Sequence, residues 1–249
     1  MQKIIASFTG EYALTRVEVM AEIEAVFAAR LSQWYQLPVL VFFRDDLRLE
    51  AVAYNQTGGV VMQRLVEMSE IKGRGTLKRQ LETNLAKAAV LKQAARYKHF
   101  EKELLWGEIT ACDAEQNLYV ETEVIAGERV TAICPLNRIG LHERHSGKFA
   151  MGRRRAFHLR RVEPVMLNGT PRLKVMVDRV SKTLVETLLR SQLGPDAERI
   201  KLRCLKRYVG HKSIVFSTGR LPRSAIIAVD RELKERVQVE IVKSLPGDE

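Results

Sequence analysis

The chain has 249 residues, of which 46% are hydrophobic and 29% are charged, a balance that excludes a wholly disordered protein. This length allows two or three small domains with separate cores. No apolar run approaches the roughly 18 residues of a membrane-spanning helix, and the first eight residues turn polar too soon for a secretory signal. We therefore expect a cytoplasmic protein without a membrane partner.

The formal net charge of +11 is concentrated in one stretch of the chain. Residues 151–236 carry 21 basic and 8 acidic residues, whereas residues 105–150 carry 4 basic and 7 acidic residues. A concentrated basic field attracts a polyanion, most commonly nucleic acid; the alternative is a solvated basic surface without a specific partner. A membrane surface is disfavoured because the basic residues alternate with apolar ones instead of forming an amphipathic basic helix.

The first elements in chain order are a helix and short strands. Apolar residues at steps of three and four predict an amphipathic helix over residues 15–35, and Thr15 with Glu18 forms a capping-box pattern at its start. The elements expected next are strands over 39–43 and 47–54, a turn over 55–59, and a strand or short helix over 60–68, where periodicity does not decide.

A long helix is predicted from Thr76 to about Leu105. One stripe of it is apolar, and Lys and Arg fill the other faces. At 1.5 Å per residue such a helix spans about 45 Å, which is typical of a connector between domains. The stripe consists of Leu77, Leu81, Leu85, Ala88, Leu91, Ala95 and His99.

Beyond Trp106 the period changes to two, which predicts strands. Five short strands suit a small Greek-key barrel of the OB type, and Asn168-Gly169 is a strong hairpin signal between the last two. The strands are expected over 107–112, 117–122, 129–134, 155–163 and 171–179. The order that follows, helix 182–192, strands 199–208 and 212–218, helix 225–236 and strand 237–242, matches a small module of the KH type.

Three segments lie at junctions between these predicted pieces: residues 98–109 (KHFEKELLWGEI), 177–185 (VDRVSKTLV) and 231–242 (RELKERVQVEIV). They resemble the connector entering the barrel, the passage into the first KH helix and the end of the first KH domain in NusA, the family of bacterial transcription elongation and termination factors. The resemblance implies an α+β multidomain fold: a helix-strand N-terminal domain with its connector helix (1–104), an S-one-type OB barrel (105–180) and a KH-like domain (181–249).

The chain departs from the family's pattern in the last domain. The family grips RNA through a GxxG loop, and the corresponding residues here are Gly219-Arg220-Leu221-Pro222. Proline has no N–H group and a fixed φ, so it cannot supply the same close backbone approach. The helix that normally precedes the loop is also missing, and the resemblance ends before a second KH domain. The chain thus resembles a shortened, divergent relative with a degenerate loop.

Two basic sets are candidates for RNA contact. The first lies at a predicted barrel strand, where arginines bind phosphates and aromatic rings stack on bases. Because Phe157 alternates with Leu159, the alternative is that Phe157 belongs to the barrel core, which leaves Phe149 as the available aromatic. The first set is Phe149, Arg153, Arg154, Arg155, Phe157 and His158; the second is Lys201, Arg203, Lys206, Arg207, His211, Lys212, Arg220 and Arg223.

No catalytic motif is evident. His142 and His145 are one residue too close for the HExxH zinc motif, and the three cysteines are too widely spaced for a disulfide framework or a metal site, so we expect buried free thiols and no cofactor. The resemblance implies a non-enzymatic factor that docks on RNA polymerase through residues 1–104, contacts nascent RNA through residues 105–243, modulates pausing, termination or antitermination, and meets other elongation factors. The alternatives are a polymerase-independent RNA-binding regulator or chaperone, and an RNA-processing enzyme subunit with a cryptic site.

Overall fold

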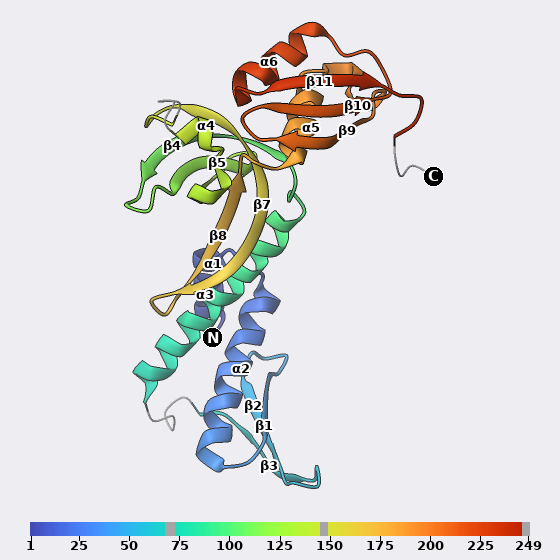
Figure 1. The fold of residues 1–249 in the computed structure, drawn as a ribbon. Helices are drawn as coiled ribbons and strands as arrows, with labels where there is room; N and C mark the ends of the chain where they lie inside the picture. The colour runs from blue at the N-terminus through green and yellow to red at the C-terminus, as the bar shows by residue number, and fades with distance from the viewer. Residues whose placement is uncertain (68–72, 145–148, 246–249) are drawn as a thin grey trace. The chain divides into compact units, whose positions relative to one another are not determined.

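The computed structural model describes residues 1–67, 73–144 and 149–245, and its class is α+β, as expected (Figure 1). Across these ranges the chain forms six α-helices, two sheets of three strands and a closed barrel of five strands. It divides into two compact units: unit 1 is Met1–Ala94 with Pro164–Leu173, and unit 2 is Ala95–Glu163 with Lys174–Glu249. No helix within the described ranges is long and apolar enough to cross a membrane.

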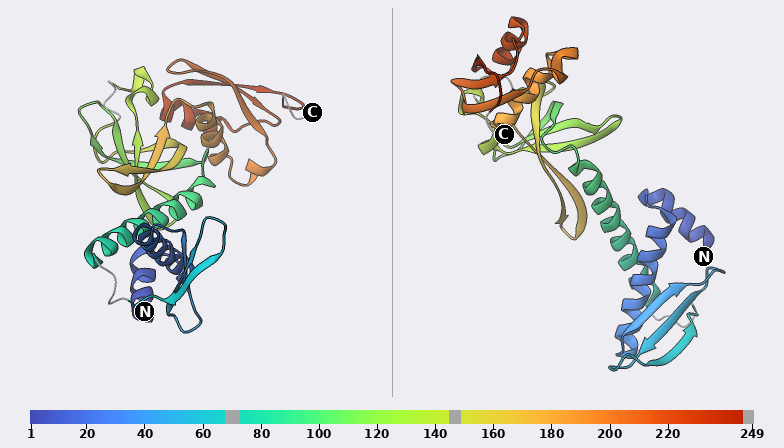
Figure 2. Two further views of the ribbon diagram at one scale, coloured as in Figure 1. Left: turned by 90° about the horizontal axis from the view of Figure 1, so that it is seen from below. Right: turned by 90° about the vertical axis from the view of Figure 1, so that its right-hand side faces the viewer.

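Unit 1 packs helices on one face of an antiparallel sheet with the strand order β1-β2-β3 (Figures 1 and 2). Val41 and Ala51 face each other in the sheet and share a core with Ile23 and Phe27 of α2. The expected capping box is confirmed, since Thr15 Oγ1 accepts from the Glu18 N–H and Glu18 accepts from the Thr15 N–H. The elements are α1 (Gln2–Tyr12), α2 (Arg16–Tyr35), β1 (Val39–Phe43), β2 (Leu49–Tyr54) and β3 (Val60–Leu65).

Helix α1 and strand β3 are the two elements of this unit that the sequence did not predict or left undecided. Helix α1 was not expected, because its sequence mixes small and polar residues and buries only Ile5. The segment from residue 60, for which periodicity did not decide between strand and helix, is the strand β3. Its hydrogen bonds to β2 stabilise the strand, and such pairing cannot be read from the segment's own sequence.

The long helix α3 (Arg74–Lys98) ends earlier than expected. Leu104 already belongs to strand β4, so the predicted end near Leu105 is wrong. Lys102 has a φ of 77°, and its N–H donates to the Leu159 carbonyl at 2.8 Å, which turns the chain into the barrel. Leu91, expected on the apolar stripe, is 48% exposed, whereas Tyr97 is fully buried.

The first part of unit 2 is a closed barrel with the strand order β4-β5-β6-β8-β7, of which residues 164–173, around the β7–β8 hairpin, are counted with unit 1. Strand β4 pairs antiparallel with β5 and β7, and β5 pairs antiparallel with β6, whereas β6 and β8 are parallel through the pair Ala132 and Val175. The expected hairpin turn at Asn168-Gly169 is present, and both residues have positive φ. The elements are β4 (Leu104–Cys112), β5 (Leu118–Ile125), β6 (Glu128–Cys134), a short helix α4 (Leu141–Arg144), β7 (Arg154–Leu167) and β8 (Thr170–Asp178).

The second part of unit 2 is a mixed sheet of order β11-β10-β9 with helices on one face. Strand β10 pairs antiparallel with β9 and parallel with β11. Ser181 caps the first helix, because its Oγ accepts from the Leu184 N–H at 3.2 Å. The elements are α5 (Lys182–Ser191), β9 (Leu202–Tyr208), β10 (Lys212–Ser217), α6 (Arg223–Leu233) and β11 (Arg236–Ile241), and we call this part the C-terminal module.

The expectation of buried thiols is confirmed for two cysteines and wrong for the third. Cys134 and Cys204 are buried, and burial raises the pKa of the Cys204 thiol to about 11. Cys112, at the end of β4, is exposed.

Candidate nucleic-acid interface

The arginine-rich start of β7 is divided between the surface and an internal contact. Arg153 and Arg154 are exposed. Arg155 is only 23% exposed, and its Nη1 lies 3.5 Å from the Glu232 carboxylate on α6. Arg153 and Arg154 therefore stay candidate phosphate contacts, whereas Arg155 is engaged within unit 2.

Phe157 and His158 are corrections to the predicted interface. Phe157 is 0% exposed and belongs to the core, the alternative that its alternation with Leu159 indicated, and His158 is 6% exposed with Nδ1 3.3 Å from Asp178. The outer face of β7 is covered as well, since Ala156 is fully buried in the core of the C-terminal module. Neither the Phe157 ring nor the His158 ring can therefore reach RNA.

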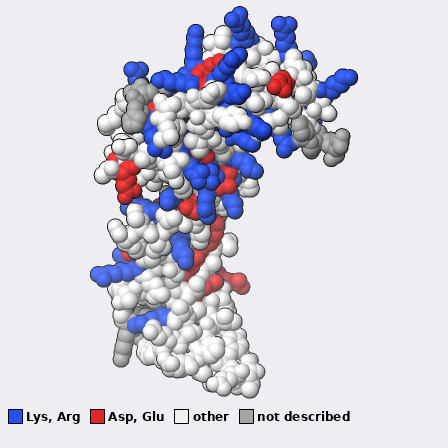
Figure 3. Space-filling model, in the orientation of Figure 1, with Lys and Arg blue, Asp and Glu red and all other residues white. Residues whose placement is uncertain are grey.

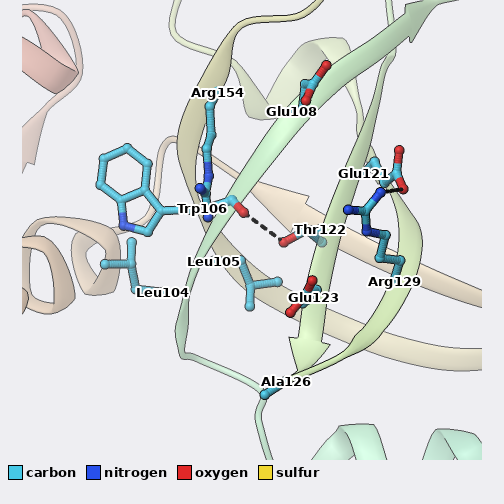
Figure 4. A pocket seen from close by; sticks show the side chains of 10 residues that line it. All are labelled: Leu104, Leu105, Trp106, Glu108, Glu121, Thr122, Glu123, Ala126, Arg129 and Arg154. Carbon is cyan, nitrogen blue, oxygen red and sulfur yellow. Dashed lines mark hydrogen bonds and ion pairs between the residues drawn. The ribbon is translucent and has the colours of Figure 1, made fainter.

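Trp106 on β4 is an exposed aromatic that the sequence did not single out. It is 39% exposed, and its partner across the strands is Ala156 of β7. Trp106 and Arg154 both line a hollow of about 490 Å³, which Figure 4 shows. The sequence missed Trp106 because it fell at the predicted end of the long helix. The charged residues that line the hollow are Glu108, Glu121, Glu123, Arg129 and Arg154. With three carboxylates against two guanidinium groups, this hollow does not favour a phosphate chain.

Arg179 joins the barrel to the C-terminal module and is fully buried. Its guanidinium contacts Glu143 at 2.5 Å and 3.0 Å, Glu232 at 2.9 Å and the Ala156 carbonyl, and it lies over the rings of Phe149 and Phe157. Burial opposes the charged form, but the hydrogen bonds and charges of the carboxylates outweigh it and raise the pKa of Arg179. Phe149 is therefore half-buried against Arg179, which makes it a poor candidate for base stacking.

The second basic set lies largely on one face of the C-terminal sheet. Leu202, Cys204 and Val215 point into the core beneath the helices, so their neighbours along each strand point to the other face. We call this other face the open sheet face. Its rows across the strands β9, β10 and β11 are Tyr208–Lys212–Arg236, Lys206–Ile214–Gln238 and Arg203–Phe216–Glu240. Lys201, just before the start of β9, extends the face by one more residue.

Arg207 is a further correction. Its side chain is 1% exposed and forms two hydrogen bonds of 2.9 Å with the fully buried carboxylate of Glu235. Glu235 also accepts from the Gly210 N–H, so the pair fixes the turn between β9 and β10. A buried arginine with this partner serves packing, and we remove Arg207 from the candidate interface.

The segment 218–222 runs directly from β10 into α6, without an intervening helix, as the sequence suggested. Arg220 and Arg223 are exposed, whereas Leu221 is 7% exposed and packs into the core of the module. Pro222 is the N-cap residue of α6 without a side-chain hydrogen bond. The loop thus presents two cations on either side of a buried anchor, and both stay predicted RNA contacts.

No protein-family model matches the chain, and no curated protein matches it significantly. What the candidate interface can bind is therefore inferred from its residues and their positions alone. Within the described ranges, no three His, Cys, Asp or Glu residues come together as a metal site.

Proposed function

We propose that the protein is an RNA-binding transcription factor similar to NusA, which docks on RNA polymerase and modulates pausing, termination or antitermination. The observation that carries RNA binding is the concentration of 21 basic against 8 acidic residues in residues 151–236. Figure 3 shows Lys and Arg side chains gathered over the C-terminal module. Such a field supports capture of a polyanion.

The topology of unit 2 supports the finer assignment. A closed five-stranded barrel is compatible with an OB-type barrel of the S-one kind. The order α5-β9-β10-α6-β11 with one parallel strand pair is compatible with a KH-like module that lacks the helix before its loop. Both module types bind single-stranded nucleic acid, which makes nascent RNA the proposed ligand.

An apolar sheet face in unit 1 supports a protein partner for this unit. Leu40 and Phe42 of β1 are 59% and 40% exposed, and Val60 of β3 is 59% exposed. All three lie outside the core that the sheet forms with α2. Exposed apolar patches are typical of protein-binding sites, and we propose RNA polymerase as the partner.

The proposal is tested with the purified full chain on a sizing column, together with core RNA polymerase at moderate salt and without RNA. We expect co-migration, and we expect it to be lost when Leu40→Glu and Phe42→Glu place charges on the apolar face. Val17→Glu, on an exposed position of α2, is the matched control and should co-migrate. Salt-sensitive RNA binding without co-migration of the wild-type protein would instead establish a polymerase-independent RNA regulator.

A further inference from the structure

The open sheet face carries aromatic rings and cations side by side, and these side chains lie outside the core of the C-terminal module. Tyr208 is 51% exposed, Phe216 is half-buried on the central strand β10, and neither belongs to the core that α5 and α6 cover. The charged residues in the three rows are Arg203, Lys206, Lys212 and Arg236 against Glu240 alone. Three rows with four cations and one carboxylate are complementary to a phosphate chain.

The spacing of the two rings suits two bases of an unpaired strand that have one nucleotide between them. Tyr208 pairs with Lys212, which lies four residues before Phe216 on β10. At about 3.3 Å per residue and about 4.8 Å between strands, the two rings are roughly 14 Å apart. Ile214, half-buried between them, leaves an apolar surface over which a further nucleotide can lie.

We infer that the open sheet face is a stacking platform for single-stranded RNA, on which Phe216 and Tyr208 each carry one base while Lys206, Lys212 and Arg236 contact phosphates. This inference rests on the proposed RNA-binding function and names the surface and the form of RNA. Base stacking on aromatic side chains of a sheet is sequence-tolerant and needs unstacked bases. A duplex hides those bases, so the platform discriminates against double-stranded RNA.

The experiment measures fluorescence anisotropy of the full chain with a labelled oligouridylate and with a labelled RNA duplex. The variant Phe216→Leu with Tyr208→Leu keeps apolar bulk but removes both aromatic faces, and Phe216→Trp with Tyr208→Trp restores them. Leucine offers no aromatic face on which a base can stack, so we expect the leucine variant to lose roughly tenfold or more in affinity for the single strand. The duplex affinity should not change, and the tryptophan variant should bind the single strand like the wild-type protein.

Other outcomes separate this inference from the function on which it rests. If the wild-type protein binds the single strand and the folded leucine variant binds it equally well, the platform is wrong and RNA binding stands. If the wild-type protein binds neither RNA at low salt, both proposals fail. If the leucine variant loses affinity equally for RNA and for polyglutamate, the face binds acidic protein segments, and the stacking platform is overturned. Circular dichroism and thermal unfolding establish that each variant is folded.

Discussion

At the residue scale, Arg179 links the barrel to the C-terminal module within unit 2. Its guanidinium is shared between Glu143 of α4 and Glu232 of α6, and it also bonds the Ala156 carbonyl of β7. Three elements from two parts of the unit therefore depend on one cation. A buried ion pair adds little compared with apolar residues of the same volume, but removing one partner leaves an uncompensated buried charge.

We therefore expect Arg179→Met to lower the free energy of unfolding by about 3–5 kcal/mol, measured by urea denaturation. Arg161→Met is the matched control, because Arg161 is 66% exposed and pairs with Glu163 at 2.8 Å on the same barrel. Exposed pairs of this kind contribute about 0.2–1 kcal/mol. Equal effects of the two substitutions would show that Arg179 does not hold the unit together.

Glu18 gives unit 1 a pH-dependent contribution to stability. Its carboxylate accepts from Lys92 Nζ at 2.7 Å and caps α2, and these hydrogen bonds lower its pKa to about 2. A lowered pKa in the folded state means that the contribution is present above the ordinary pKa of about 4.5 and is lost as the pH falls towards 2. We expect Glu18→Gln to remove this part of the pH dependence in unfolding curves between pH 2 and 6. Because the pair is partly exposed, the difference should stay below about 1 kcal/mol, and Lys92→Met should reduce it.

At the scale of elements, periodicity and capping residues predicted most helices and strands, whereas pairing between strands determined where the elements end. The capping residues Thr15 and Ser181 begin α2 and α5 where the patterns predicted. Helix α3 ends at Lys98 because the next residues pair with β7, a partner more than 50 residues away in the chain. Periodicity within a window does not contain such distant partners, so the predicted helix ran too far.

The cap of α5 offers a test at this scale. Ser181→Ala removes the side-chain acceptor for the Leu184 N–H and should lower the free energy of unfolding by about 1 kcal/mol. Ser181→Gly should lower it by only about a few tenths of a kcal/mol. Ser191→Ala at the other end of α5 serves as the comparison, since Ser191 is exposed and should change stability by less than about 0.5 kcal/mol. A loss at Ser191 as large as at Ser181 would argue against the cap.

At the scale of the whole molecule, the charge distribution predicts salt-dependent RNA binding. Replacing Arg220 and Arg223 together by Ala should lower RNA affinity and reduce the slope of log K against log salt by about one for each phosphate that the variant no longer binds. Lys78→Ala with Arg79→Ala on α3 removes the same charge from unit 1 and should leave the slope nearly unchanged. An unchanged slope for the Arg220 and Arg223 variant, in the same titration, would remove these two residues from the interface.

Local sequence patterns were sufficient for most of the helices and strands, the strand-rich second half and the helix caps, because periodicity and capping act within a few residues. The concentration of positive charge was equally visible, because it is a sum along the chain. Only the tertiary structure decided which basic and aromatic residues reach the surface. A period of two places Arg207 on the same face as the exposed Arg203, yet a register shift and the partner Glu235 bury it. Burial depends on contacts between distant elements, which no local pattern records.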